Sequence, residues 1–373
     1  MKGCDYTGVT LRLLAPLALA ALAACHTKPP PAAPDAPPER AHHRGDTVQH
    51  RYGEFETRRS TEFWRWKLDQ HLNGLPPPPS TPIPTVVPDR AFIDANARAG
   101  RAMQPAVTWI GHATTLVQLD GLNLITDPVF SERVSPVTFA GPKRHQPPAI
   151  ALADLPRIDV VLVSHNHYDH CDVASLRALA RQPGGPPRFV VPLGLRALLA
   201  DAGIGDVIEL DWWQSTTVNG VAGPTEIVLT PVQHWSGRRL DDRMETLWGG
   251  YAVLSPGLNV YFAGDTGYSP DFADTRARFA ARGGFDFALL PIGAYEPRWF
   301  MQLQHMNPDE AVRAHLDLRA RSTLGIHWGT FELTDEPLDQ PPRDLAAARA
   351  KHGVSEDAFY TMPIGGTRRL APR

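Results

Sequence analysis

The heptapeptide S-H-N-H-Y-D-H, residues 164–170, directly follows a run at residues 158–163 that is apolar except for Asp159. A largely apolar run of this length is typical of a strand that is buried on both faces. Four side chains of the heptapeptide are of types that bind metals: His165, His167, Asp169 and His170. Imidazole nitrogens and carboxylate oxygens suit zinc or a similar divalent metal. A solvated loop without metal is the alternative, but three His and an Asp rarely gather there by chance, so the segment predicts a metal site.

Three further ligand-type side chains each follow an apolar strand later in the chain. They are His234 in the string PVQHWS, Asp265 in FAGDTGY and His327 in GIHWGTF. One His or Asp in such a place is more often structural than functional. Because side chains at the strand ends of an α/β sheet meet at one edge, the four positions together predict a single site.

Around these positions, short predicted strands alternate with predicted helices. Strands are expected at residues 107–110, 115–119, 122–126, 158–163, 188–192, 207–210, 226–231, 249–254, 259–263, 287–291 and 323–327. Helices are expected at residues 61–72, 174–181, 194–202, 271–281 and 308–318. The last helix has a strong start, with Asn307 as N-cap, Pro308 at the first position and Glu310 closing a capping box. This order predicts the α/β class, and two sheets between helices are one layout that fits.

The metal-binding pattern is similar to a known family. The motif HxHxDH, followed by His, Asp and His at later strand ends, resembles the metallo-β-lactamase superfamily. The blocks SHNHYDHCD, LLPIGAYEPRWFM, QHMNPDEAV and IHWGTF resemble, more narrowly, the subfamily that contains N-acylphosphatidylethanolamine-hydrolysing phospholipase D. The chain is more distantly similar to L-ascorbate-6-phosphate lactonases. The resemblance covers residues 107–370, and Cys171 departs from it, since an apolar residue such as Leu is expected there.

The resemblance implies a fold and a metal centre. The fold would be an αββα sandwich of two mixed β-sheets flanked by helices, with two Zn²⁺ per chain or with Fe or Mn in their place. One metal would be bound by His165, His167 and His234, and the other by Asp169, His170 and His327, with Asp265 bridging them. Two such metals, roughly 3.5–4 Å apart, activate water and neutralise charge on a phosphoryl group.

The resemblance also implies a reaction. It is the hydrolysis of a phosphodiester in an N-acylphosphatidylethanolamine-like phospholipid, which releases an N-acylethanolamine and phosphatidic acid. A lactonase or a phosphodiesterase on a soluble substrate is the alternative enzyme. A non-catalytic metal-binding lipoprotein of the envelope is the alternative of another class, although no expected ligand is missing.

Several other residues are candidates for the reaction. Asp169 and Asp265 would orient the attacking water, and His305 would donate a proton or contact the phosphate. Arg298 would pair with the phosphodiester. Trp299 would line a groove for an acyl chain or, equally, lie in the core. His112 is expected to contact a metal ligand or to lie in the core, rather than to bind metal itself.

The N-terminus resembles a bacterial lipoprotein signal. Lys2 and Arg12 flank an apolar stretch, residues 13–24, which is too short to span a bilayer as a helix. The stretch ends in LAAC at residues 22–25, as in a lipobox, in which the Cys is lipidated and becomes the mature N-terminus. An ordinary signal cleaved near Ala24 is the alternative. We therefore expect a lipid anchor at Cys25.

These features divide the chain into four expected parts. They are a lipoprotein signal peptide (1–24), a disordered Pro-rich tether (25–45), an N-terminal helix with an extended strap (46–105) and a catalytic domain of metallo-β-lactamase fold (106–373). The expected location is the cell envelope, lipid-anchored on the periplasmic side of a bacterial membrane, with the outer membrane favoured. Only Cys171 would then remain as a free thiol, so no intramolecular disulfide is expected.

Composition limits the partners. Of 373 residues, 43% are hydrophobic and 21% are charged, which is typical of a globular protein. The formal net charge of −3 argues against a broad, positively charged surface for nucleic acid, so no nucleic-acid partner is expected. The expected partners are the phospholipid substrate and the membrane, and a homodimer is a further possibility.

Overall fold

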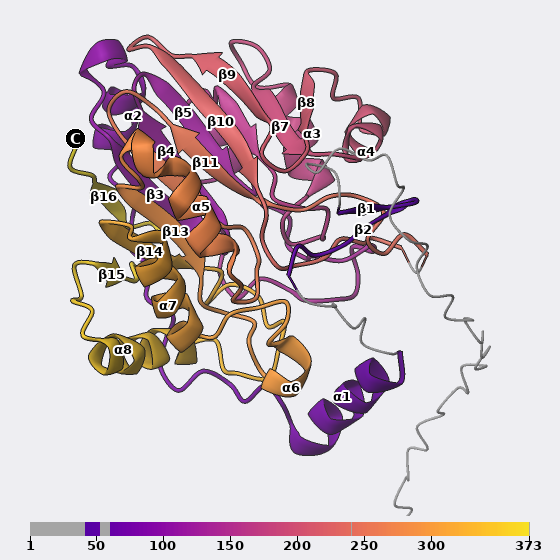
Figure 1. Cartoon of the computed structure of the whole chain (residues 1–373). Coiled ribbons are helices and arrows are strands. Elements are labelled where there is room, and N and C mark those ends of the chain that lie inside the picture. Colours follow the sequence, from indigo (N-terminus) through magenta and orange to yellow (C-terminus); the bar gives the residue numbers. More distant parts are fainter. Residues whose placement is uncertain (1–41, 53–59, 240, 373) are drawn as a thin grey trace, which may run out of the picture.

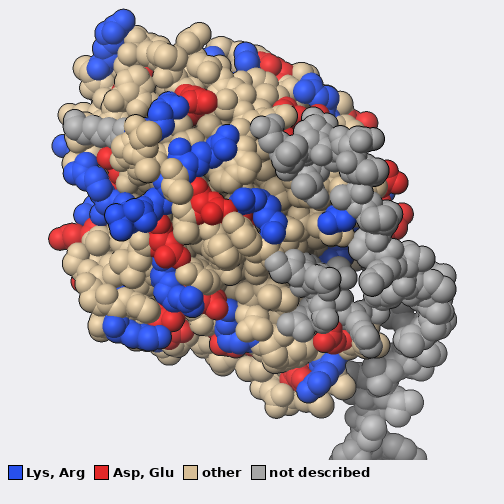
Figure 2. All heavy atoms as spheres, viewed as in Figure 1, with Lys and Arg blue, Asp and Glu red and all other residues tan. Residues whose placement is uncertain are grey.

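The structure is a computed structural model, and it describes residues 42–52, 60–239 and 241–372. The predicted signal peptide, Cys25 and most of the predicted tether lie outside the described residues. Within those residues, no helix has both the length and the apolar character needed to cross a bilayer. Lys and Arg side chains are interspersed with Asp and Glu over the face drawn in Figure 2.

Two seven-stranded mixed sheets form the centre of the protein, as Figure 1 shows. The order of the first sheet is β16 (Thr367–Arg369), β3 (Ala106–Gly111), β4 (Thr114–Leu119), β5 (Leu122–Thr126), β6 (Val160–Leu162), β7 (Arg188–Pro192) and β8 (Val207–Leu210). The order of the second is β15 (Phe359–Tyr360), β14 (Ser322–Ile326), β13 (Phe287–Pro291), β12 (Asn259–Phe262), β11 (Gly250–Leu254), β10 (Pro224–Thr230) and β9 (Ser215–Asn219).

Helices cover the outer face of each sheet, so the fold is the expected αββα sandwich. Ile93, Leu176 and Leu199, from three helices, pack with the first sheet in one apolar cluster. Phe272, Val312 and Leu345, from three others, join the larger cluster that contains the second sheet. The helices of the first set are α2 (Arg90–Ala97), α3 (Val173–Ala180) and α4 (Arg196–Asp201), and those of the second are α5 (Asp271–Phe279), α7 (Pro308–Leu318) and α8 (Gln340–His352). The remaining helices are α1 (Ser60–Asn73) and α6 (Arg298–Met301).

The direction of the strands brings the predicted ligands together. In the first sheet, β3 and β5 are both antiparallel to β4, and β6 is parallel to β5, so all three end at the same edge. In the second sheet, β10 and β12 are both antiparallel to β11, and β13 and β14 continue parallel to β12. Each ligand-bearing loop therefore leaves a carboxyl end that faces the same side of the sandwich.

Two expectations for the N-terminal part are wrong in detail. The extended strap expected within residues 46–105 contains a second helix, α2, whose first turn is capped by the Asp89 carboxylate accepting from the backbone N–H of Phe92. The end of the segment expected to be a disordered tether is ordered, because β1 (His43–Arg44) pairs with β2 (Thr47–Val48). The helix predicted at residues 61–72 is present as α1.

Candidate metal centre

The heptapeptide at residues 164–170 forms the loop between β6 and α3. The backbone N–H groups of His170 and Cys171 both donate to the carbonyl of His167, at 3.2 and 2.8 Å, which closes the loop into a turn. Asp172 then caps α3 by accepting from the backbone N–H of Ala174. This local structure directs His165, Asp169 and His170 into the interior of the site, where each imidazole is buried.

Three imidazole nitrogens form the first donor group. Nε2 of His165 lies 2.8 Å from Nδ1 of His167, and Nε2 of His234 lies 3.3 Å from that same Nδ1. Ligands of a tetrahedral zinc ion with Zn–N of about 2.0–2.1 Å are separated by about 3.3 Å, so the group has nearly the required size. His165 Nδ1 donates to the Ser164 hydroxyl and His234 Nδ1 donates to the Gln304 carbonyl, which leaves each Nε2 lone pair facing the group.

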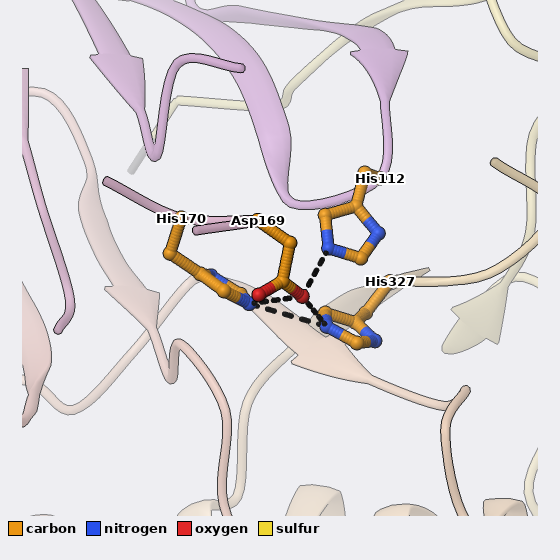
Figure 3. A group of neighbouring side chains, drawn as sticks. All are labelled: His112, Asp169, His170 and His327. Atoms are coloured by element: carbon orange, nitrogen blue, oxygen red, sulfur yellow. Dashed lines mark hydrogen bonds and ion pairs between the residues drawn. The ribbon is translucent and has the colours of Figure 1, made fainter. Parts of the chain in front are cut away.

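A carboxylate and two imidazoles form the second donor group, drawn in Figure 3. Nε2 of His170 and Nε2 of His327 are 3.2 Å apart, and Asp169 Oδ2 lies 3.3 and 3.5 Å from them. His112 Nε2 approaches the same carboxylate oxygen at 3.0 Å. His112 therefore contacts a candidate ligand, as expected, and holds Asp169 in place.

Asp265 lies between the two groups. Its Oδ2 is 3.0 Å from His170 Nε2 and 4.0 Å from His234 Nε2, and its Oδ1 is 3.1 Å from His327 Nε2. The preceding Gly264 has φ +62, and a Cβ there would lie 2.5 Å from the Cβ of Ser164. Glycine thus allows the Asp265 loop to approach the heptapeptide closely.

The arrangement of these nitrogen and oxygen atoms suits a bound cation better than it suits hydrogen bonds among the side chains themselves. The facing nitrogens of His165 and His167, at 2.8 Å, and of His170 and His327, at 3.2 Å, can share at most one proton in each pair. In addition, Asp265 Oδ1 and His305 Nδ1 are buried without a hydrogen bond among the described residues. Burial lowers the pKa of His167 and of His234 to about 3, so both offer lone pairs at neutral pH. Burial opposes a charge on His327, but the Asp265 and Asp169 carboxylates raise its pKa to about 9.

Asp127 is the residue of the site that the sequence analysis missed. It follows β5 in the string LITDPVF, and it is fully buried. Its Oδ2 accepts from His170 Nδ1 at 2.6 Å and from the Ser164 hydroxyl at 2.6 Å, so it supports both donor groups. The signal was available, because Asp127 ends an apolar strand just as Asp265 does. His112, Asp127 and His327 all have positive φ, a strain that is found at functional sites.

The three predicted substrate residues lie beside the centre in different ways. His305 is close to it, with Nδ1 3.8 Å from Asp265 Oδ2 and a side chain that is 13% exposed. Burial lowers the pKa of His305 to about 3, so it is a neutral imidazole at pH 7. Trp299 is 39% exposed on α6.

The guanidinium of Arg298 makes three contacts within the protein, and its expected pairing with substrate stays a prediction. Its guanidinium donates to the carbonyls of Tyr295 and His305 and to the Glu310 carboxylate, at 3.1, 2.9 and 2.6 Å. Because Glu310 also closes the capping box of α7, Arg298 fixes the turn that carries His305.

Two arginines near the site, Arg238 and Arg144, and the free thiol of Cys171 also make contacts within the protein. Arg238 donates to the carbonyls of Asn166 and Cys171, and Arg144 donates to those of Ser131 and Val129. Cys171 is buried in the apolar cluster of the first sheet, and burial raises the pKa of its thiol to about 12. A thiol of this kind is protonated at neutral pH and poorly reactive.

The chain matches known proteins over most of its length. A family model described as a β-lactamase superfamily domain matches residues 122–328. N-acyl-phosphatidylethanolamine-hydrolyzing phospholipase D 1 of Caenorhabditis elegans is 41% identical over 267 residues, which covers 69% of this chain and 74% of that protein. An uncharacterized protein of Mycobacterium tuberculosis is 43% identical over 296 residues, which covers 78% of this chain and 73% of the relative.

Solved structures share the fold. An isothiocyanate hydrolase from Delia radicum gut bacteria aligns with a TM-score of 0.56 at 20% identity, covering 72% of this chain and all of the other. The family and the fold expected from the motifs are confirmed. The chain belongs to the metallo-β-lactamase superfamily, within the subfamily of N-acylphosphatidylethanolamine-hydrolysing phospholipase D-like proteins, and it is a metal-dependent hydrolase.

Proposed function

We propose that the protein binds two zinc ions and hydrolyses the phosphodiester of an N-acylphosphatidylethanolamine-like phospholipid. The observation that carries the proposal is the pair of donor groups with Asp265 between them. Six further side chains would complete the two metal sites: His165, His167, His234, Asp169, His170 and His327. The 41% sequence identity to the nematode phospholipase supports a phospholipid of this class as the substrate.

Two bound divalent ions would lower the pKa of water to about 7 and neutralise charge on the phosphoryl oxygens. The protein's own groups then position the reactants. Asp169, held by His112, and Asp265 would orient the attacking water toward phosphorus. The water oxygen bonds to phosphorus, the bond to the oxygen of the N-acylethanolamine breaks, and that oxygen takes a proton. His305 would donate a hydrogen bond to the phosphoryl or the leaving oxygen.

An exposed apolar surface on α1 supports a lipid substrate. Trp64, Leu68 and Leu72 are 68%, 56% and 70% exposed, and their spacing of four residues places them on one stripe of the helix. On its other side, α1 contacts α6 through Trp66, whose ring lies 4.9 Å from that of Phe300. Figure 1 shows the two helices near each other. Because His305 follows α6 by four residues, the stripe is linked to the candidate metal centre and could rest on a membrane near it.

We also propose where in the cell the protein lies. A lipid anchor at Cys25 would attach the protein to the envelope, on the periplasmic side of a bacterial membrane. The Pro-rich residues that follow would let the catalytic domain reach headgroups of the leaflet that holds the anchor.

The direct test is turnover of N-acylphosphatidylethanolamine in detergent micelles, with the two products measured by mass spectrometry. We expect both products in equal amounts, their loss after treatment with a chelator, and their return when zinc is added. A lactone and a soluble phosphodiester serve as parallel substrates. Turnover of either one without turnover of the phospholipid would contradict the proposed substrate and support a soluble-substrate hydrolase.

A further inference from the structure

A second cluster of metal-ligand side chains lies outside the candidate metal centre. His42 Nε2 is 2.7 Å from Asp211 Oδ1, and His43 Nε2 is 2.9 Å from Asp211 Oδ2. The three donor atoms lie within 4.8 Å of one another. The cluster shares no residue with the candidate metal centre.

The fold builds this cluster from distant parts of the chain. The β1–β2 hairpin carries the two His, and Asp211 directly follows β8 at the end of the first sheet. The hairpin is itself attached, since the backbone N–H of Val48 donates to the carbonyl of Met244 at 2.8 Å. Residues 169 positions apart therefore meet where the N-terminal segment joins the catalytic domain.

The donors are held in place by their surroundings. The backbone N–H of Trp212 donates to Asp211 Oδ1 at 2.8 Å, which orients the carboxylate. The Trp212 ring packs on the His42 ring with 4.3 Å between centroids, and its indole N–H donates to the carbonyl of Trp248. Side chains fixed in this way are characteristic of metal ligands, whose orientation depends on the groups behind them.

Burial and spacing are both suited to a metal. The side chains of His42 and Asp211 are 6% and 3% exposed, whereas that of His43 is 27% exposed. One side is thus open to solvent, as needed for entry of an ion and for a water as fourth ligand. The separations of 2.7 and 2.9 Å are shorter than the tetrahedral edge of about 3.3 Å, but the His165–His167 pair shows the same contraction at 2.8 Å.

We propose that His42, His43 and Asp211 bind a third divalent metal ion, of the zinc type, that fastens the N-terminal segment to the catalytic domain. Two imidazoles and a carboxylate are a common protein ligand set for zinc. The alternative is a clasp of hydrogen bonds alone, in which each imidazole donates to one carboxylate oxygen. Both stabilise a buried carboxylate, so metal content is what separates them.

The test compares metal content among purified full-length variants, prepared with zinc and without chelator. His43→Ala is the main variant, because His43 is partly exposed and its loss should leave the fold intact. His145→Ala is the matched control, since its side chain is 40% exposed and pairs with Glu332 away from the cluster. We expect elemental analysis to give about one ion per chain less for His43→Ala than for the wild type, and no loss for His145→Ala.

The result does not depend on how many ions the candidate metal centre binds, because the test uses only the difference in metal content between each variant and the wild type. A second measurement is anomalous scattering at the zinc edge from crystals, which should show a peak among the three side chains. Equal metal content in His43→Ala and the wild type, together with no such peak, would overturn the proposal. A lowered melting temperature with unchanged metal content would identify the cluster as a hydrogen-bonded clasp and would overturn it as well.

Discussion

Asp265 is the side chain on which both donor groups depend. Its carboxylate lies within 4.0 Å of His234 in the first group and of His170 and His327 in the second. It follows β12 in the string FAGDTGY, where Gly264 lets its loop lie against Ser164. A change at this residue should therefore affect the metals without affecting the apolar core.

Replacement of Asp265 with Asn is expected to leave the protein folded while turnover falls at least about a hundredfold. The amide removes the negative charge that would join two metals. Turnover and far-UV circular dichroism measure the two effects, and Asp241→Asn, at a carboxylate that is 78% exposed, is the control. If the Asp265→Asn protein kept more than a tenth of wild-type turnover, the bridging role would be wrong.

Asp127 tests whether the groups behind the ligands matter. Its carboxylate fixes the tautomer of His170, so Asp127→Asn should weaken metal binding about 10–100-fold with a smaller effect on secondary structure. Competition with a chromophoric chelator measures the affinity. Unchanged affinity would show that His170 is oriented by other contacts.

The motifs pointed to the seven candidate ligands that the fold brings together, but they did not point to Asp127. The ligands were recognisable because each follows an apolar strand within a specific motif. Asp127 has the same placement but lacks a motif of imidazoles around it. The contacts of Arg298 with the carbonyls of Tyr295 and His305 could not be predicted, because they are set by a backbone turn that composition does not reveal.

Helices and strands were predicted correctly where the sequence carries a strong local signal, such as a helix cap. The start of α7 was predicted to the residue, because Asn307, Pro308 and Glu310 form a complete capping signal. Strand β9 was missed because its residues are polar and alternate between exposed and half-buried at the sheet edge. Helix α2 was missed because one capping residue, Asp89, is its main start signal.

Helix α1 makes a prediction at the scale of an element. Trp64→Ser combined with Leu68→Ser should reduce turnover of phospholipid in vesicles several-fold, because these exposed side chains would enter the interface. Turnover of short-chain substrate in solution should be unchanged, since neither residue contacts the candidate metal centre. Arg65→Ser, at a side chain that is 75% exposed on the same helix, is the control. Equal turnover of vesicles by the double variant would remove α1 from the membrane contact.

At the scale of the whole molecule, the fold sets the site by topology. Strands of two sheets that end at one edge place seven candidate ligands together, although they span residues 165–327. The His42–Asp211 contacts are also a product of the complete fold, and no local pattern predicted them. Long-range contacts of this kind are what sequence alone does not reveal.

The proposed anchor is a prediction about the whole chain in the cell. Cys25→Ser should release the protein from the membrane fraction, because the acyl chains that would provide stable attachment are absent. Turnover of dispersed short-chain substrate should survive, while turnover of native membranes falls. Retention of the Cys25→Ser protein on membranes after a high-salt wash would refute the anchor.

The central claim is that two metal ions lie in one centre, shared through Asp265. It is tested most directly by anomalous diffraction at the zinc edge from crystals grown with zinc. Our account predicts two peaks roughly 3.5–4 Å apart, one among His165, His167 and His234 and the other among Asp169, His170 and His327, with Asp265 contacting both. A single peak, or none, at these side chains would contradict it.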